Sequence, residues 1–290
     1  MIAYRTFFAS VAVAWFSIAS HAESTSRRVT ASCLPVYCLI APLASVRCMV
    51  EVLLPPAVEP HDYQLSPADV RRLQGSQLIV LNGLGLDDWL ERGLKRAGIT
   101  QATKVVRLAD GLQSEVIRQD GFTNAHIWMD PVLMKSAVSN LTARLVEFDP
   151  EGKTQYLQAC VRMLAQLTKL DAELQSQLNV KSARPVVSWH DAQAYFFRRY
   201  QVKEAGTIEL PGEQGTSAVH LKALGKAVRA SGTKVLFVEA EPAPLLAKRL
   251  AQDWKLSVAV LRTVETGPLD ADFYFQVLRG NAAQIARFAP

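Results

Sequence analysis

Histidine and cysteine are scarce in this sequence, whose 290 residues contain five His and four Cys. No CxxC pair occurs, which excludes the usual zinc-ribbon and redox spacings. The chain also lacks an HExxH helix, a GxSxG elbow and a P-loop. The sequence therefore offers no motif for a zinc peptidase, a serine hydrolase or a P-loop nucleotidase.

Runs of like charge are missing as well. The formal net charge is +5, and no Lys/Arg run exceeds two residues. Neither a nucleic-acid-binding stripe nor a polybasic membrane patch is expected from that pattern. A content of 49% hydrophobic and 20% charged residues excludes wholesale disorder. The length predicts two domains of roughly 100–150 residues, each able to bury a core.

The first 22 residues have the pattern of a secretory signal peptide. Arg5 supplies the positive charge, Phe7–Ile18 the apolar stretch, and Ser20-His21-Ala22 a small-x-small cleavage site. The apolar stretch is shorter than the ~20 residues that a membrane-spanning helix needs, and no other segment qualifies. The sequence thus predicts a cleaved signal peptide at 1–22, a periplasmic location and no direct membrane anchor.

The cysteine side chains have two open interpretations. Export permits disulfides, and four cysteines allow three pairings. One disulfide among Cys33, Cys38 and Cys48 is consistent with their spacing, and so are buried free thiols. Cys160 lies on the apolar stripe of a predicted helix.

Strand and helix patterns alternate along the chain. Apolar runs at Val29–Ala41 and Cys48–Leu54 predict two strand regions that flank a helix or turn, and Ser66-Pro67-Ala68-Asp69 predicts a helix start. The expected elements that follow are a strand at 77–81, a helix at 86–97 and a strand at 104–108. Such alternation is typical of a parallel sheet covered by helices.

The longest helical pattern begins at Asp149 and predicts a helix that joins two lobes. Its apolar residues recur at intervals of three and four. Beyond it, strand and helix patterns alternate again. The predicted fold is α/β, with two lobes of parallel sheet and flanking helices joined by one long backbone helix. The predicted division is a signal peptide at 1–22, an N-terminal lobe at 23–148, a linking helix at 149–179 and a C-terminal lobe at 180–290.

Three histidines lie in loops at or near predicted strand ends. His61 occurs in PHDY, His126 in AHIWMDP and His190 in WHDAQAYF. Ligands of open α/β sheets collect beyond the carboxyl ends of strands, so three such side chains could converge on a His₃ metal site. Taken singly, each of them is more often a structural or surface residue than a ligand. Their wide spacing carries no metal signature by itself. His220 lies in a predicted surface helix.

Five segments together resemble the zinc/manganese solute-binding proteins of bacterial ABC transporters, the group called cluster A-I. In chain order they are LLPPAVEPHDYQLSPADVRRLQGSQLIVLNG, ADGLQSE with AHIWMDP, WHDAQAYFFRRYQV, LPGEQGTSAVHLKAL and VLFVEAEPAP. The resemblance implies two lobes bridged by a rigid helix, a metal held between them, and delivery to a membrane permease. By motif, it implies that His61, His126 and His190 are metal ligands.

Three carboxylates adjoin these motifs without matching a ligand position. Asp130 and Asp191 are expected to orient imidazoles from outside the ligand shell, or to cap helices and bond loops. Glu239 ends a predicted strand near the cleft and is expected to form hydrogen bonds between loops.

The fourth ligand is where this sequence departs from the resemblance. Arg262 aligns with the family's Asp, and a guanidinium cannot bind a metal because it stays protonated. Glu265 and Asp270 are nearby carboxylates, and water is a third alternative. The His-rich loop of some zinc-specific members is also missing, since 100–119 contains no His.

The metal and its destination follow from the ligand set and the resemblance. Three neutral imidazoles favour Zn²⁺ over Mn²⁺. We expect a monomer that binds Zn²⁺ with no catalytic residue and delivers it to an inner-membrane ABC permease, without nucleic acid as a partner. The alternatives are a Mn²⁺- or Fe²⁺-preferring member of the same family, a secreted zinc-dependent hydrolase, and a secreted adhesin or metal-sequestering protein.

Overall fold

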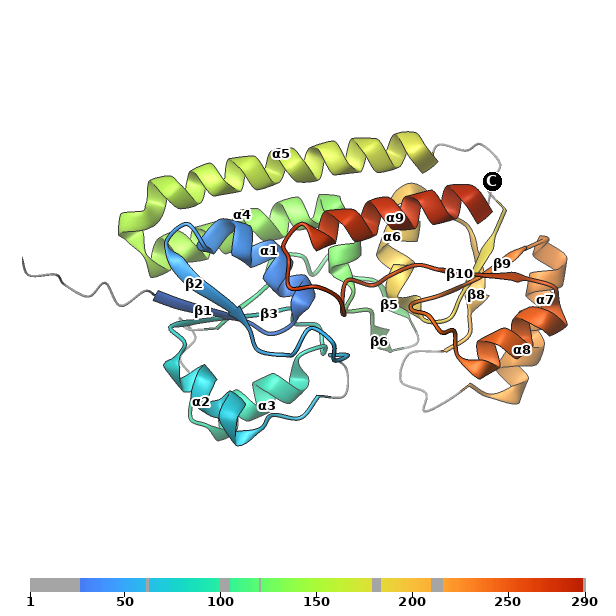
Figure 1. Ribbon diagram of the computed structural model, residues 1–290, viewed down its shortest axis with the longest axis horizontal. Helices are drawn as coiled ribbons and strands as arrows, with labels where there is room; N and C mark the ends of the chain where they lie inside the picture. The colour runs from blue at the N-terminus through green and yellow to red at the C-terminus, as the bar shows by residue number, and fades with distance from the viewer. Residues whose placement is uncertain are drawn as a thin grey trace, which may run out of the picture.

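Two four-stranded parallel sheets, one in each half of the chain, form the framework of the molecule (Figure 1). The computed structural model describes residues 27–60, 63–99, 105–119, 121–178, 184–209 and 216–288. The first sheet, ordered β2-β1-β3-β4, contains β1 (Arg27–Ala31), β2 (Cys48–Val52), β3 (Leu78–Leu81) and β4 (Val105–Arg107). The second, ordered β10-β9-β7-β8, contains β7 (Val186–Ser188), β8 (Glu204–Thr207), β9 (Val235–Val238) and β10 (Ser257–Val260). All their strand pairs are parallel, which confirms the predicted α/β class.

The two sheets have the same topology. In each, the first strand of the half lies between the second and the third, and the fourth pairs with the third. Helices α2 (Pro67–Gly75) and α3 (Asp88–Arg96) cover one face of the first sheet around a small apolar core. Helices α7 (Ala218–Ser231) and α8 (Leu245–Trp254) cover one face of the second sheet in the same way.

A shared layer of helices joins the two halves on the opposite faces of the sheets. It contains α1 (Leu34–Ala44), α4 (Pro131–Phe148), α5 (Lys153–Leu178), α6 (Ala194–Tyr200) and α9 (Phe273–Phe288). The 26 residues of α5 extend about 39 Å at 1.5 Å per residue, and the helix runs past both sheets (Figure 1). This confirms the long helix that links the lobes. It begins at Lys153 because the short 3₁₀ turn η2 (Pro150–Gly152) precedes it.

The strand prediction for Val29–Ala41 is wrong over most of its length. Only the first three of these residues belong to β1, and α1 occupies the remainder from Leu34. Nine of the eleven α1 residues are buried, so the helix has no polar face to reveal its period. Pro35 in its first turn fixes a helical φ and gives up an amide hydrogen that the helix does not need.

All four cysteines are buried with free thiols, which rules out the disulfide alternative in this structure. Burial raises the pKa of the Cys33 thiol well above its usual range, and raises the pKa of Cys38 to about 12. Such thiols are poor nucleophiles and poor metal ligands. They contribute to packing as small apolar side chains.

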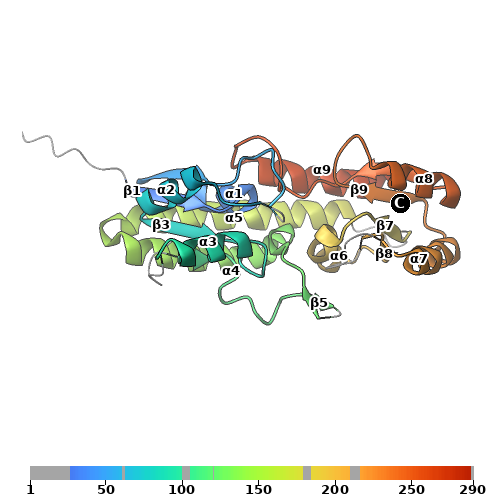
Figure 2. The ribbon, with the colours of Figure 1, turned by 90° about the horizontal axis from the view of Figure 1, so that it is seen from below.

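A short antiparallel hairpin leads from the first half to the shared helices. It consists of β5 (Arg118–Gln119) and β6 (Phe122–Thr123), and it projects from the body of the molecule (Figure 2). In the described part of the chain, no helix has the length and hydropathy to cross a bilayer. The predicted signal peptide lies outside the described residues, and the exact lobe boundaries stay a prediction.

Candidate metal centre

His126 lies in the loop between the β5–β6 hairpin and α4. The 3₁₀ turn η1 (Ile127–Met129) follows it directly, and Asp130 then caps α4 by accepting hydrogen bonds from the amides of Val132 and Leu133. A short polar side chain before a proline at the first helical position is a strong helix start. The cap therefore fixes where the His126 loop must end.

Asn124 fixes both the position and the tautomer of His126. Its Oδ1 accepts the His126 backbone N–H at 2.9 Å, so this atom is an acceptor and lies 3.0 Å from His126 Nδ1. In the neutral ring Nδ1 must then carry the proton, which leaves the lone pair on Nε2. With an exposed fraction of 2%, the ring is held in the form that binds a metal through Nε2.

His190 follows strand β7 and is enclosed by two carboxylates. Its Nε2 lies 3.0 Å from Asp191 Oδ1, and its Nδ1 lies 3.0 Å from Glu239 Oε1 at the end of β9. Burial disfavours the imidazolium, but hydrogen bonds to Asp191 and Glu239 outweigh burial and raise the pKa of His190 to about 10. The imidazolium form of His190 is therefore favoured by its contacts with Asp191 and Glu239.

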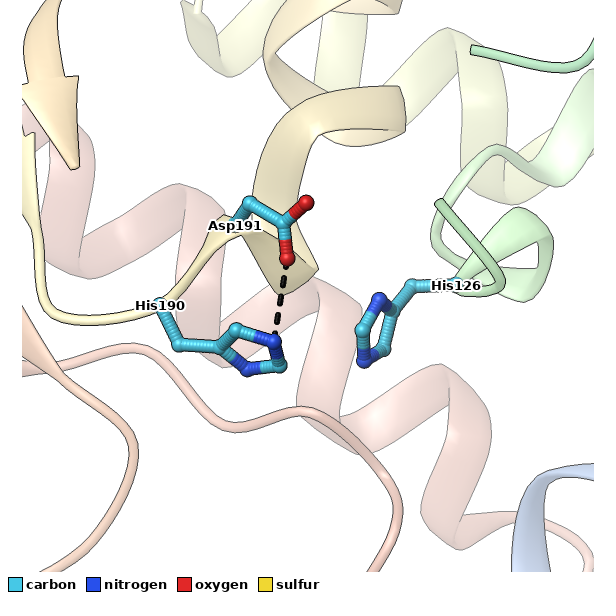
Figure 3. A group of neighbouring side chains, drawn as sticks. All are labelled: His126, His190 and Asp191. Carbon is cyan, nitrogen blue, oxygen red and sulfur yellow. Dashed lines mark ion pairs between the residues drawn. The ribbon is translucent and has the colours of Figure 1, made fainter. Parts of the chain in front are cut away.

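The two histidines and Asp191 converge on one point (Figure 3). One ligand atom from each of the three lies within 4.8 Å of the other two, and the imidazole centroids are 4.9 Å apart. Asn124 Nδ2 also donates to Asp191 Oδ2 at 2.9 Å, so a single amide touches both His126 and Asp191. Groups from both halves of the chain thus meet within coordination range of one ion.

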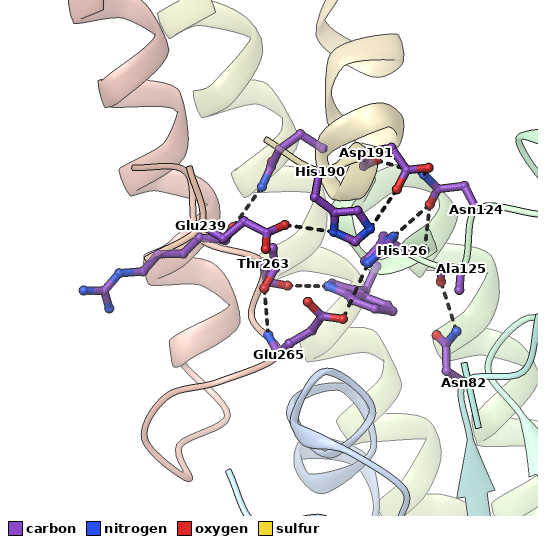
Figure 4. Close-up of polar contacts among 12 residues, drawn as sticks. Asn82, Asn124, Ala125, His126, His190, Asp191, Glu239, Thr263 and Glu265 are labelled. Carbon is purple, nitrogen blue, oxygen red and sulfur yellow. Dashed lines mark hydrogen bonds and ion pairs between the residues drawn. The ribbon is translucent and has the colours of Figure 1, made fainter. Parts of the chain in front are cut away.

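Glu265 adds a second carboxylate to this group (Figure 4). Its Oε1 lies 3.5 Å from His126 Nε2, and its exposed fraction is 1%. Because buried carboxylates occur where they are paired or hold a cation, this placement favours Glu265 as the oxygen donor.

A tight backbone turn brings Glu265 inward. Val264 has a φ of 71°, which a β-branched residue adopts only under strain. The turn is held on one side by the Trp128 Nε1–H, which donates to the Thr263 carbonyl at 2.7 Å. On the other side Gly267 has a φ of 157°, and a Cβ there would collide with the Phe273 ring. These constraints fix the direction of the Glu265 side chain.

The other residues singled out from sequence lie elsewhere or act differently. Asp270 is exposed, its carboxylate accepts from the Asp272 amide near the start of α9, and it is not brought to the His pair. Arg262 is exposed beside the centre, while His220 bonds the Thr207 carbonyl from α7. His61 lies outside the described residues. Asp130 caps α4, whereas Asp191 and Glu239 contact His190 directly.

A cavity of about 690 Å³ opens beside the centre. Its walls come from the ends of β9 and β10, from α9 and from the loop that carries Glu59. Glu239 belongs both to this wall and to the His190 environment. The cavity therefore meets the His190 environment at Glu239.

Sequence reasoning missed two neutral residues that support the centre. Asn124 precedes His126 by two positions, a spacing at which Asn accepts from the backbone and builds an Asx turn, and this was the available signal. Asn82, which follows β3, donates to the Ala125 carbonyl at 3.0 Å. No local pattern in the sequence links Asn82 to a residue 43 positions away.

The described groups suit the binding of a transition metal. They supply two imidazoles from different elements and two carboxylates, and the hydrogen-bonded second nitrogens raise the basicity of the rings. Nitrogen with oxygen donors in a small buried group is typical of zinc.

The chain is similar to known proteins in both sequence and structure. Residues 29–288 match the ZnuA family, described as "Zinc-uptake complex component A periplasmic". The chain is 27% identical to the high-affinity zinc uptake system protein ZnuA of Bacillus subtilis over 228 residues, which cover 74% of this chain and 72% of that protein. It is 29% identical to the manganese-binding lipoprotein MntA of Halalkalibacterium halodurans over 177 residues, covering 60% and 58% of the two chains. A crystal structure of a 138–173 ZnuA deletion mutant with zinc bound superimposes with a TM-score of 0.80 at 26% identity, covering 91% and 98%.

Proposed function

The chain belongs to the ZnuA family of periplasmic zinc-uptake components, and from that premise we propose that it binds one Zn²⁺ between its lobes and delivers it to an ABC permease. The observation that carries the proposal is the meeting of His126, His190 and Glu265 from three distant segments. Zinc is the cargo of this carrier rather than a resident cofactor. We propose no catalytic role for these residues.

The proposed ligands are His61, His126, His190 and Glu265. His126 already presents the lone pair of Nε2, since Asn124 holds the Nδ1 proton. His190 must lose its extra proton, and the metal must take the place that Asp191 Oδ1 holds against Nε2. Glu239 remains on Nδ1 and orients the ring, in the arrangement usual for zinc-bound histidines.

Zinc titration of chelator-stripped protein, in competition with a chromophoric chelator, tests this ligand set. We expect Glu265→Ala to weaken Zn²⁺ binding by at least about 10-fold, because it removes a donor from the buried group. Asp270→Ala removes the other carboxylate considered from sequence and serves as the matched control. A loss of affinity in Asp270→Ala, with none in Glu265→Ala, would reverse the assignment.

One observation favours manganese or iron as a second candidate cargo. Asp191 lies within the same 4.8 Å group, so a site using both Asp191 and Glu265 offers more oxygen donors. Competition between Zn²⁺ and Mn²⁺ for the stripped protein decides this. Retention of Mn²⁺ in the presence of equimolar Zn²⁺ would identify manganese as the cargo.

Delivery and location are the remaining parts of the proposal. Export through the segment at 1–22 would place the chain beside an inner-membrane permease, where it acts as a monomer without an anchor. Deleting its gene should slow growth in zinc-limited medium, and added zinc should restore the growth. Normal growth of the deletion strain, in a background without other zinc-uptake systems, would contradict a role in transport. It would favour a protein that sequesters zinc instead.

A further inference from the structure

The outward faces of α7 and α8 carry a group of exposed basic side chains. On α7, Lys222, Lys226 and Arg229 are exposed at positions i, i+4 and i+7, which places them in one stripe. On α8, Lys248 and Arg249 are exposed. Among the residues that the structure describes, none of these five side chains forms an ion pair with an acid.

The corresponding helices of the first half differ in their charge pattern. Helices α2 and α3 contain three acids, Asp69, Asp88 and Glu91, which form ion pairs with neighbouring arginines. Helices α7 and α8 contain only one acid, Asp253. The two halves share a topology, so the difference in charge between these helices comes from their side chains and not from a different fold.

An exposed apolar residue precedes the basic residues on each helix. Val219 lies one turn before Lys222 with an exposed fraction of 81%, and Leu245 lies one turn before Lys248 with an exposed fraction of 74%. Both helices follow parallel strands and pack on the same face of the sheet. Their first turns therefore lie at the carboxyl edge of the sheet, the edge that also carries His190.

We propose that this face of α7 and α8 binds the surface of a bilayer that contains anionic phospholipids. The Lys and Arg side chains match the phosphate headgroups in charge, while Val219 and Leu245 reach the boundary between headgroups and acyl chains. The long stems of Lys and Arg also cover apolar surface while their charged ends stay in water. The absence of Lys/Arg runs in the sequence does not exclude this face, because helical spacing assembles it from separated residues.

Binding to the bilayer goes beyond the proposed metal transport and does not require zinc. It keeps the carrier at the membrane, with the edge that carries His190 close to the lipid surface. Attraction of this kind is reversible, and salt weakens it because the charges are exposed.

Flotation of the full chain with lipid vesicles tests the proposal. The probes are vesicles of phosphatidylcholine alone and of equal parts phosphatidylcholine and phosphatidylglycerol, each at about 0.01 M and about 0.15 M salt. We expect binding to the anionic vesicles only, stronger at the lower salt. The charge reversal K222E/K226E/R229E should reduce the partition coefficient by at least about 10-fold.

A matched variant distinguishes the effect of this face from the effect of the protein's total charge. R71E/K95E/R96E makes the same change in charge on α2 and α3, and we expect it to keep vesicle binding. Zinc titration of both variants should match the unaltered protein, so failure of the lipid proposal is distinguishable from failure of the metal proposal.

Three results would overturn the proposal. The first is equal binding to neutral and anionic vesicles, and the second is an equal loss in both charge-reversal variants. The third is a protein partner: if K222E/K226E/R229E weakens association with the permease in purely neutral lipid, the basic face binds an acidic protein surface instead.

Discussion

The carboxyl ends of the two sheets carry different chemistry although the sheets share a topology. In the first half, Ser32 follows β1 and Asn82 follows β3, and both are buried and neutral. In the second half, His190 lies beyond β7 and Glu239 follows β9. At these strand ends the first half thus holds the backbone beside His126 in place, through bonds such as Asn82 to Ala125, while the second half supplies charged side chains.

Buried carboxylates in the two halves show the same contrast. Burial raises the pKa of Asp87 in the first half to about 6, against hydrogen bonds from Ser32 and Gly83 that lower it. Burial also acts on Asp191 in the second half, but its bond to His190 outweighs burial and lowers its pKa. A buried carboxyl among neutral groups is thus harder to ionise, whereas a cationic partner stabilises the ionised form.

The largest expected effect is the loss of His190, a proposed ligand from the second half. His190→Ala should weaken zinc binding by at least about 100-fold, since losses of outer partners alone cost about 10–100-fold. Competition with a chromophoric chelator measures the change. His220→Ala, also in the second half, is the control, because His220 bonds a carbonyl away from the centre. Equal losses of zinc affinity in both variants would show that His190 is no more important for zinc binding than His220.

The buried carboxyl of Asp87 in the first half should make the stability of the fold depend on pH. The pKa of Asp87 is about 6 in the folded chain against 3.8 in the unfolded chain. Ionising this carboxyl therefore costs more free energy in the folded chain than in the unfolded chain. Stability should therefore fall as pH rises from about 4 to about 6, by up to about 3 kcal/mol, and should stay lower above that window. Asp87→Asn should remove this component. Denaturant unfolding of both proteins at about pH 4 and about pH 7 measures it, and an unchanged pH dependence in the variant would contradict the expectation.

Asn124 connects the two halves and should have an intermediate effect. Asn124→Ala removes the acceptor that holds the proton on His126 Nδ1 and the donor to Asp191. We expect zinc affinity to fall by about 10-fold or more. Nitrogen NMR of the imidazoles should show His126 losing its single tautomer. Weaker binding with an unchanged tautomer would mean that Asn124 acts only through Asp191.

The smallest expected effect concerns helix starts. Ser66 and Asp69 form a reciprocal capping box on α2, whereas Ser217 caps α7 by accepting from His220 alone. Ser66→Ala should therefore cost about 1 kcal/mol of unfolding free energy, and Ser217→Ala less. Thermal or denaturant unfolding compares the two. A larger loss in Ser217→Ala would show that the second half depends more on its caps.

Much of the fold was predictable because its elements have regular patterns. The long helix showed a clear apolar stripe, and alternation of strands with helices indicated parallel sheets. Helix α1 was misread since burial on all sides removed its period. Topology, not local sequence, brings α9 beside α5.

The candidate centre was predictable only in part. His126 and His190 could be found because histidine is rare and their motifs are specific. The choice between Glu265 and Asp270 depended on a strained turn at Val264, and no spacing rule reveals a positive φ at a valine. Asn82 and Asn124 act through bonds to distant backbone, which a linear sequence does not display.

The hydrophobic cluster beneath α5 extends through residues of both halves without interruption. Separating the lobes would expose that cluster to water, so we expect His126, His190 and Glu265 to be assembled before an ion binds. Metal capture then buries little additional apolar surface, and its heat capacity change should be close to zero by calorimetry. In kinetic terms, we expect loading with the ion to require dehydration of the ion and the departure of a proton from His190, and to need no slow closing of the lobes.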